Sequence, residues 1–447
     1  MANPTIQNLA ADLAASRTTS RKLTEDALAR IEDPKGEGKR AFIKVYKAQA
    51  LAAADASDVL RKAGIVLSPL AGLPVSIKNL CNVAGETTLA GSKALVDAPP
   101  AKQDAPVVAR LRAAGAVVVG STNMSEFAFS GVGANPHYGT PGNPADRKRV
   151  PGGSSSGAAV SVGDQMAVAA LGTDTGGSVR IPSAVCGLVG LKPTARRVPI
   201  DGVVPLSISL DSIGPLANSV ECCAIVDAVF AGKPIVVPEA ARLSGLRFGI
   251  PRQFVMDDLD PVVANAFERA CKALSAQGAK IEQVDLPQLN ELPAINAKGG
   301  FAAPEAYAWH QKLIARRGNL YDPFVHPRIM RGKEMSAADY IDLLHARADL
   351  QKRVSAVTQN YDAVISPTCA ITAPTLEEVA TPEGFTKKNL LLLRNTTIGN
   401  FLDRCAISLP CHAAGELPVG FMLMAESMAD KRLLAMARSV APVIAGR

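Results

Sequence analysis

The segment GGSSSGAAVSVG (152–163) places glycines and serines directly before an apolar run with helical character. An apolar strand, MAVAALGT (166–173), follows, and a second glycine–serine run, DTGGS (174–178), comes where that strand ends. A flexible linker would be extended by further polar residues, whereas apolar elements flank these runs. The pattern therefore predicts tight, glycine-permitted turns within an α/β sheet.

Neither run has the residues of a phosphate-binding loop. A P-loop needs lysine and then Ser or Thr after its last glycine, but Ala158 and Ala159 follow Gly157. The dinucleotide fingerprint GxGxxG is broken at its last position in GVGANP (131–136). We therefore expect no nucleotide and no cofactor.

Short apolar strands alternate with helices on both sides of this segment, as expected for a wound α/β sheet. The predicted strands before and after the serine runs are AFIKVY (41–46), LPVSIKNL (73–80), AVVVG (116–120), GLVGLKPT (187–194), YDAVISP (361–367), CAISLP (405–410) and VGFMLMA (419–425). The predicted helices include the periodic stretch from Ile6 to Ile31, an alanine-rich run ending near Lys62, DAPVVARLRAAG (104–115) and 157–164.

The chain reads as one domain over residues 1–447, since no linker or repeat interrupts it. We expect a central mixed, mostly parallel β-sheet covered by helices on both faces. A helix-rich stretch from about 219 to 360 predicts a helical insertion in the second half. Hydrophobic residues make up 48% of the chain and aromatic residues only 4%, which suits Ala-, Val- and Leu-rich helices packed on a buried sheet.

Charge and cysteine content exclude several classes of protein. The net charge is +7, but Lys and Arg are dispersed and the densest cluster is only 147–149, so we expect no nucleic-acid partner. The eight cysteines form no CxxC pair and lack the histidine partners of a zinc site, so we expect free thiols and no metal. The start of the chain has no signal-peptide pattern, and no apolar run is long enough for a membrane span. A cytoplasmic protein is the expectation, and a homodimer is compatible with it.

The run DTGGS is suited to a serine nucleophile, because its glycines leave backbone N–H groups uncovered beside Ser178. Such a serine needs a base. None of the five histidines lies in either run, although a distant histidine is not excluded. Lys78 ends the apolar strand LPVSIKN, and burial would lower its pKa enough for a base. An exposed strand end is the equally open alternative.

These stretches resemble the amidase signature family, which includes fatty acid amide hydrolase, malonamidase and the A subunit of the tRNA-dependent amidotransferase. The resemblance is dense over a signature core of about 70–220 and looser elsewhere. The matching stretches are PVSIKNL, GAVVVGSTNMSEF, NPADRKRVPGGSSSGAAVSVG, ALGTDTGGSVRIPSAVCGLVGLKPT, LDSIGPLANSV and ELPVGFMLM.

The resemblance implies a Lys–Ser–Ser catalytic set. Lys78 matches the base, Ser154 the bridging serine that follows a cis peptide bond, and Ser178 the nucleophile. The implied oxyanion hole consists of the N–H groups of Thr175, Gly176, Gly177 and Ser178, and the implied supporting residues are Ser155, Asp174 and Arg180. Ser156 stands where most members have glycine, which leaves the mechanism intact.

The implied activity is hydrolysis of a small-molecule carboxamide to carboxylate and ammonia or amine through an acyl-enzyme. The alternative is the glutaminase component of the amidotransferase. That component carries an EASSNLARYDG-like stretch, where this chain has APEAYAWHQKLIARRG (303–318), and an aspartate that is missing from LLLLRNTTIGN (390–400). A free-standing hydrolase is therefore favoured.

The substrate pocket is the least determined part of the sequence. Met124 and Phe127 match positions beside the acyl group, but they are equally suited to an ordinary core. Arg328, Arg331 and Arg394 lie in variable regions, where each either holds a substrate carboxylate or lies on the surface.

Overall fold

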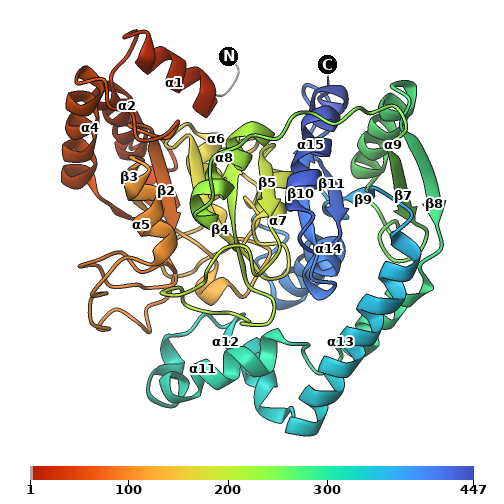
Figure 1. The fold of residues 1–447 in the computed structure, drawn as a ribbon. Helices are drawn as coiled ribbons and strands as arrows, with labels where there is room; N and C mark the ends of the chain where they lie inside the picture. The colour runs from red at the N-terminus through yellow and green to blue at the C-terminus, as the bar shows by residue number, and fades with distance from the viewer. Residues whose placement is uncertain (1–3, 447) are drawn as a thin grey trace.

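Residues 4–446, which the computed structural model describes, contain one continuous eleven-stranded sheet in the order β1-β3-β2-β4-β6-β5-β10-β11-β9-β7-β8 (Figure 1). The strands are β1 Phe42–Val45, β2 Pro74–Lys78, β3 Val117–Thr122, β4 Ala169–Asp174, β5 Val189–Lys192, β6 Ser212–Ala217, β7 Arg247–Pro251, β8 Lys280–Val284, β9 Ala363–Pro367, β10 Cys405–Pro410 and β11 Gly420–Ala425.

Helices cover both faces of this sheet, as the sequence predicts. The α-helices are α1 Ile6–Ala14, α2 Ser20–Glu32, α3 Gly38–Ala41, α4 Lys47–Lys62, α5 Pro106–Ala113, α6 Ser156–Gly163, α7 Arg180–Val185, α8 Val220–Ala231, α9 Pro261–Ala276, α10 Leu292–Ile295, α11 Ala302–Arg317, α12 His326–Met330, α13 Ala337–Thr358, α14 Pro382–Phe401 and α15 Asp430–Ile444. Short 3₁₀ turns are η1 Glu126–Ala128, η2 Pro287–Glu291, η3 Gly318–Leu320 and η4 Arg331–Glu334.

The two faces of the sheet are set by the two-residue alternation of side chains along each strand. In β4, Leu171 packs into the apolar cluster that contains residues of α8, α9 and α15. Its neighbour Ala170 packs into the opposite cluster, which contains residues of α6 and α7. The molecule is therefore a single large α/β domain built around one two-sided core.

The sheet is mixed, as expected, but the expectation that it is mostly parallel is wrong. Within the described residues six strand pairings are antiparallel and four are parallel. The parallel pairings fall in two blocks, β3-β2-β4 and β9-β7-β8. A short connection explains one antiparallel pairing: β10 and β11 are joined by residues 411–419 alone, too few for the crossover that parallel strands need.

Three strands were not predicted from the sequence. β6 contains Gly214 and Pro215, which are unusual inside strands. β7 and β8 lie inside the stretch 219–360, which is therefore not purely helical. β8 is one of the two edge strands, and only Val284 of its residues is buried, so its apolar pattern is weak.

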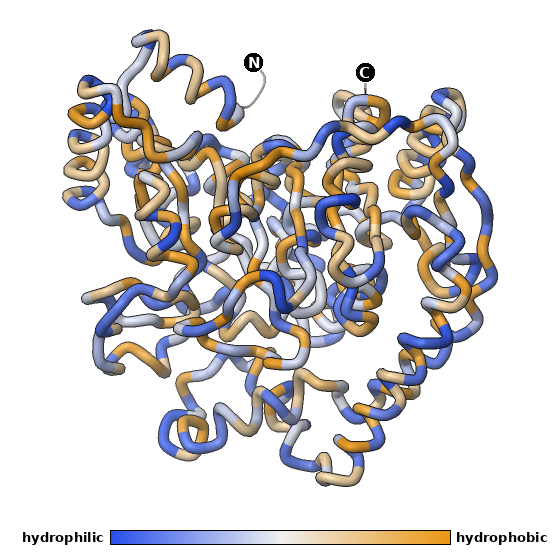
Figure 2. Tube along the Cα trace, in the orientation of Figure 1, coloured by the Kyte–Doolittle hydropathy of each residue, from blue (hydrophilic) through white to orange (hydrophobic). Residues whose placement is uncertain are grey.

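Within the stretch 219–360, helix α13 forms as an amphipathic helix with a capped N-terminus. α13 begins with a capping box in which Ser336 and Asp339 satisfy each other's backbone N–H groups. Its buried residues include Leu343, Leu350 and Val354, and apolar and polar positions alternate along it in Figure 2. Among the described helices, none has the length and apolar character that crossing a membrane requires.

Candidate active site

Lys78 lies at the carboxyl end of β2, where the whole strand is buried, and its side chain is 0% exposed. Its Nζ lies 2.7 Å from Ser154 Oγ and 2.8 Å from Thr173 Oγ1. β2 and β4 are parallel neighbours with Ile77 opposite Leu171, so their carboxyl ends come together at this point. Of the two readings that the sequence left open, the structure has the buried one.

Burial changes the acid–base behaviour of this amine. It lowers the pKa of Lys78 to about 7, because a low-dielectric interior disfavours the ammonium ion. Cys81, Asp211 and Asp174 act in the opposite direction and limit the decrease. A large share of Lys78 is therefore neutral at neutral pH and able to accept a proton.

Ser154 follows a cis peptide bond from Gly153, as the family resemblance implies. Glycine is required at 153, because a Cβ atom there would lie 2.6 Å from the backbone nitrogen of Gly133. Ser154 itself is 0% exposed, and its carbonyl oxygen accepts a hydrogen bond from Ser125 N at 3.1 Å. The backbone of Ser154 is thus held by a hydrogen bond from Ser125.

The two glycine–serine runs are in direct contact. Ser155 N donates to the carbonyl oxygen of Ser178 at 3.3 Å, and Ser155 Oγ donates to that of Thr173 at 3.4 Å. Ser156 Oγ is buried and makes no hydrogen bond in the described part of the chain. Of the three serines, Ser155 therefore contacts the backbone of Ser178, Ser154 contacts Lys78, and the Ser156 hydroxyl makes neither contact.

A buried ion pair fixes the loop that carries Ser178. Arg180 Nε and Nη2 donate to the Asp174 carboxylate at 3.0 and 2.9 Å, and both side chains are 0% exposed. Burial alone would raise the pKa of Asp174, but Arg180 outweighs it and brings the value down to about 2. Asp174 is therefore ionised at neutral pH and ties the start of the loop to its end.

Helix α14 supplies further contacts that the sequence did not reveal. Asn400 Nδ2 donates to Asp174 Oδ1 at 2.9 Å, and Thr396 Oγ1 donates to the carbonyl oxygen of Gly176 at 2.6 Å. Thr396 and Asn400 are four residues apart and so share one helix face. In the sequence, the four-residue spacing of these two polar residues within 390–400 indicates a shared helix face, but it does not identify the residues that they contact.

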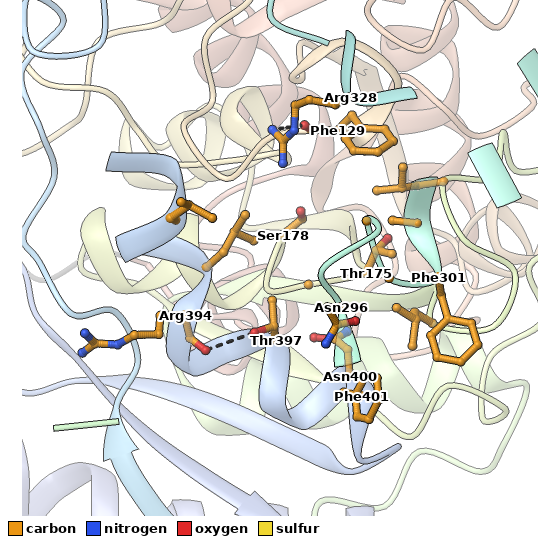
Figure 3. Close-up of a pocket in the computed structure, with 18 of the residues that line it drawn as sticks. Phe129, Thr175, Ser178, Asn296, Phe301, Arg328, Arg394, Thr397, Asn400 and Phe401 are labelled. Atoms are coloured by element: carbon orange, nitrogen blue, oxygen red, sulfur yellow. Dashed lines mark hydrogen bonds between the residues drawn. The ribbon is translucent and has the colours of Figure 1, made fainter. Parts of the chain in front are cut away.

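Ser178 opens onto a cavity of about 500 Å³ (Figure 3). Most of its lining is apolar and comes from residues near α10, α11 and α14. The sequence predicted that Met124 and Phe127 line the pocket, and this prediction is corrected here. Neither is among the lining residues, and both are at most 1% exposed. The chain turns at Phe127, where φ is 49°, and its ring packs against His310 while Ala128 and Phe129 line the cavity instead.

All three arginines from the variable regions line this cavity. Arg328 Nη1 donates to the Phe129 carbonyl oxygen at 2.7 Å, and Arg331 Nη2 donates to that of Ala297 at 2.7 Å. Arg394 extends away from the centre of the pocket in Figure 3. The lining contains no Asp or Glu, and within residues 4–446 none of the three arginines forms a salt bridge. The charged side chains in the lining are therefore all arginines.

In the described residues no three His, Cys, Asp or Glu side chains are grouped so that they would hold an ion. The polar groups of this site are the buried Lys78 amine, serine and threonine hydroxyls and backbone N–H groups. They are suited to moving a proton and stabilising an oxyanion during attack by a serine.

This fold, with a buried lysine and two glycine–serine loops, is that of an amidohydrolase. Residues 22–434 match the Amidase family, and the chain belongs to the amidase signature family, whose members act on amide C–N bonds.

The chain is similar to several named proteins of this family. It is 40% identical over 408 residues to 2-amino-5-chloromuconic acid deaminase of Comamonas testosteroni, covering 89% of this chain and 87% of that one. It is 35% identical over 456 residues to the A subunit of glutamyl-tRNA(Gln) amidotransferase from Chloroflexus aggregans, covering 94% and 92%. A crystal structure of an amidase superposes with a TM-score of 0.89 at 31% identity, covering 99% and 100%. Peptide amidase from Stenotrophomonas maltophilia gives 0.80 at 28%, covering 99% and 97%.

The two glycines before Ser178 provide a test of the loop geometry. Gly177 has φ +134°, and a Cβ there would lie 2.1 Å from Thr396 Oγ1, whereas a Cβ at Gly176 would have only contacts of 3.3 Å. Gly177→Ala is therefore expected to lower kcat by about 100-fold or more, and Gly176→Ala by less than about 10-fold. Amide hydrolysis is measured alongside circular dichroism spectra. Equal losses in the two variants would contradict the account.

Proposed function

We propose that this enzyme hydrolyses a small carboxamide to a carboxylate and ammonia or an amine, with Lys78, Ser154 and Ser178 as its catalytic residues. The observation that carries the proposal is the contact of 2.7 Å between the fully buried Lys78 amine and Ser154. A buried lysine with no carboxylate among its hydrogen-bond partners is costly as a cation. It is therefore suited to act as a neutral base.

The proposed reaction begins with proton transfer. Neutral Lys78 accepts the Ser154 hydroxyl proton, Ser154 accepts that of Ser178, and Ser178 Oγ attacks the amide carbon. The N–H groups from Thr175 to Ser178 stabilise the oxyanion. The proton returns through Ser154 to the nitrogen, the C–N bond breaks, and ammonia or an amine leaves an acyl ester on Ser178. Water activated by the same relay then releases the carboxylate and restores the serine.

Three further residues support this set without touching the reacting atoms. Asp174 and Arg180 hold the loop that carries Ser178 through their buried ion pair. Ser155 connects that loop to the run containing Ser154. Together they keep the nucleophile and its N–H groups in a fixed arrangement, which preorganised oxyanion binding requires.

The cavity argues against the alternative of an amidotransferase glutaminase component. Glutamine carries an ammonium group, and the lining has no carboxylate to bind it. In place of an aspartate, the stretch 390–400 contributes Leu390, Leu391 and Arg394 to the lining. We therefore propose a hydrolase that acts without a partner chain.

The arginines of the lining favour an anionic substrate. Arginine binds carboxylates with charge-assisted hydrogen bonds, and Arg328 and Arg331 have no carboxylate partner of their own. One similar protein is named for a reaction of an amino-substituted carboxylic acid. We propose that the substrate amide carries a carboxylate that is bound by these arginines.

The serine assignments are tested by three alanine variants. Ser178→Ala is expected to abolish hydrolysis, with kcat lowered at least about 1,000-fold, because the covalent nucleophile is lost. Ser154→Ala removes the relay and is expected to be similarly severe. Ser156→Ala is the matched control from the same run, and its loss should stay under about 10-fold, since its hydroxyl makes no hydrogen bond. A larger loss at Ser156 than at Ser154 would show that the wrong serine was chosen.

The base is tested by the pH profile of kcat/KM. Since the pKa of Lys78 is lowered to about 7, the active neutral form is lost as pH falls through that value, and activity should rise from about pH 6 to pH 8. Lys78→Ala and Lys78→Arg should be nearly inactive, because neither side chain accepts a proton. Replacing the five histidines one at a time should leave the rise in place. Loss of the rise in one histidine variant, with retention in Lys78→Ala, would refute the assignment.

Substrate charge is tested with paired amides that differ only in a terminal carboxylate. Arg331→Gln should lower kcat/KM for the carboxylated amide by about 10- to 100-fold and leave the neutral amide almost unchanged. Arg394→Gln is the control, because this side chain extends away from the pocket centre (Figure 3). If the wild-type enzyme prefers the neutral member of each pair, the anionic-substrate proposal fails.

A further inference from the structure

The loop before β6, residues 206–211, lies between the cavity and the helical insertion and is held by two carboxylates. Leu206 and Leu210 line the cavity. From one side, Asp211 Oδ2 accepts hydrogen bonds from Leu206 N at 3.0 Å and Ser207 N at 3.1 Å. From the other side, Glu305 of α11 accepts from Ser207 Oγ at 2.7 Å and Ser209 N at 3.0 Å. The loop is thus held by two partly buried carboxylates.

Asp211 also reaches the loop that carries Ser178. Thr175 Oγ1 donates to Asp211 Oδ1 at 2.5 Å. The contact follows from the sheet, because β4 and β6 are antiparallel with Asp174 opposite Ser212, which places Thr175 beside Asp211 just past the strand ends. One carboxylate therefore bonds to the loop of the proposed oxyanion hole and to the loop that lines the cavity.

The same carboxylate lies next to the environment of Lys78. Asp211 lines a small internal cavity together with Thr173 and Thr175, and Thr173 Oγ1 is a hydrogen-bond partner of the Lys78 amine. The contacts therefore run from Lys78 to Thr173 and, across this cavity, to Asp211.

The titratable groups that face Lys78 come from three elements. Cys81 follows β2, Asp174 ends β4, and Asp211 precedes β6. Asp174 is neutralised by its ion pair with Arg180. Within residues 4–446 Asp211 has no cationic hydrogen-bond partner, since it is bonded only to N–H groups and the Thr175 hydroxyl. Asp211 is thus the uncompensated carboxylate beside the amine.

Asp211 is mostly ionised in the upper part of the pH range over which activity is expected to rise. Burial raises its pKa to about 6, and Glu305 adds to the increase, while the hydrogen bonds from Thr175, Leu206 and Ser207 oppose it. In its ionised form it raises the pKa of Lys78, against the effect of burial. Without this charge, burial would make the amine a weaker base.

We propose that Asp211 is a positioning residue that holds Thr175 and the cavity-lining loop in place and supplies the negative charge beside the Lys78 amine. It does not touch the substrate or the reacting atoms. This inference rests on the proposed function of Lys78 as the base. It adds a residue outside the Lys–Ser–Ser set that controls the strength of that base.

The test compares Asp211→Asn with Glu305→Gln. Asparagine keeps an oxygen for Thr175 but removes the charge, so the rise of kcat/KM with pH should move to lower pH by about 0.5 unit or more, with a lower plateau. Glu305→Gln is the matched control, because it removes a carboxylate from the same loop that is not among the groups acting on Lys78. Its rise should stay at the wild-type pH while KM increases.

The outcomes separate this inference from the proposed function. An Asp211→Asn profile that rises at the wild-type pH, or an equal shift in both variants, would overturn the role of Asp211. A wild-type profile without a Lys78-dependent rise would overturn the base itself, and the inference with it. If Asp211→Asn does not fold, Thr175→Val breaks the hydrogen bond and keeps the charge. It should then lower kcat by about 10-fold or more at unchanged pH dependence, and an unchanged kcat would overturn the positioning role.

Discussion

Burial of the Lys78 amine is the constraint on which the rest of the site depends. A lysine placed in the interior loses the hydration of its charge and so has a lowered pKa. The sheet produces that burial, because β2 is covered on both faces and flanked by β3 and β4. The parallel register of β2 and β4 then places the amine beside Thr173 and the first serine run. A base of this kind needs no histidine.

A second constraint is the buried ion pair between Asp174 and Arg180. Breaking a buried pair by removing one partner typically costs about 3–5 kcal/mol, because a charge is left uncompensated. Here the pair is further bonded by Asn400 of α14, so the second half of the chain helps to fix a loop from the first half. The same helix lines the cavity with its leucines. One helix therefore contacts both the loop that carries Ser178, the proposed nucleophile, and the cavity.

Local motifs of the fold and the site could be predicted from the sequence, whereas contacts between distant segments could not. The serine runs, the strand ending at Lys78 and most central strands were predicted because each is a local pattern. Burial of Lys78 was not decided by its strand, since a strand end is compatible with either environment. Asn400, Thr396 and Asp211 depend on contacts between distant segments, and no local pattern names their partners. Phe127 was misplaced because a positive φ turns its ring into the core. The antiparallel pairings likewise depend on connections that apolar periodicity does not report.

The central claim is that amide cleavage passes through an acyl group on Ser178. The most direct test is partition of that intermediate between water and added hydroxylamine. One acid is supplied as its amide, its anilide and its ester, and the ratio of hydroxamate to carboxylate product is measured for each. A common acyl-enzyme predicts the same ratio for all three leaving groups, because each has departed before the partition. A ratio that varies with the leaving group, or no hydroxamate at any hydroxylamine concentration, would contradict the account and indicate direct attack by water.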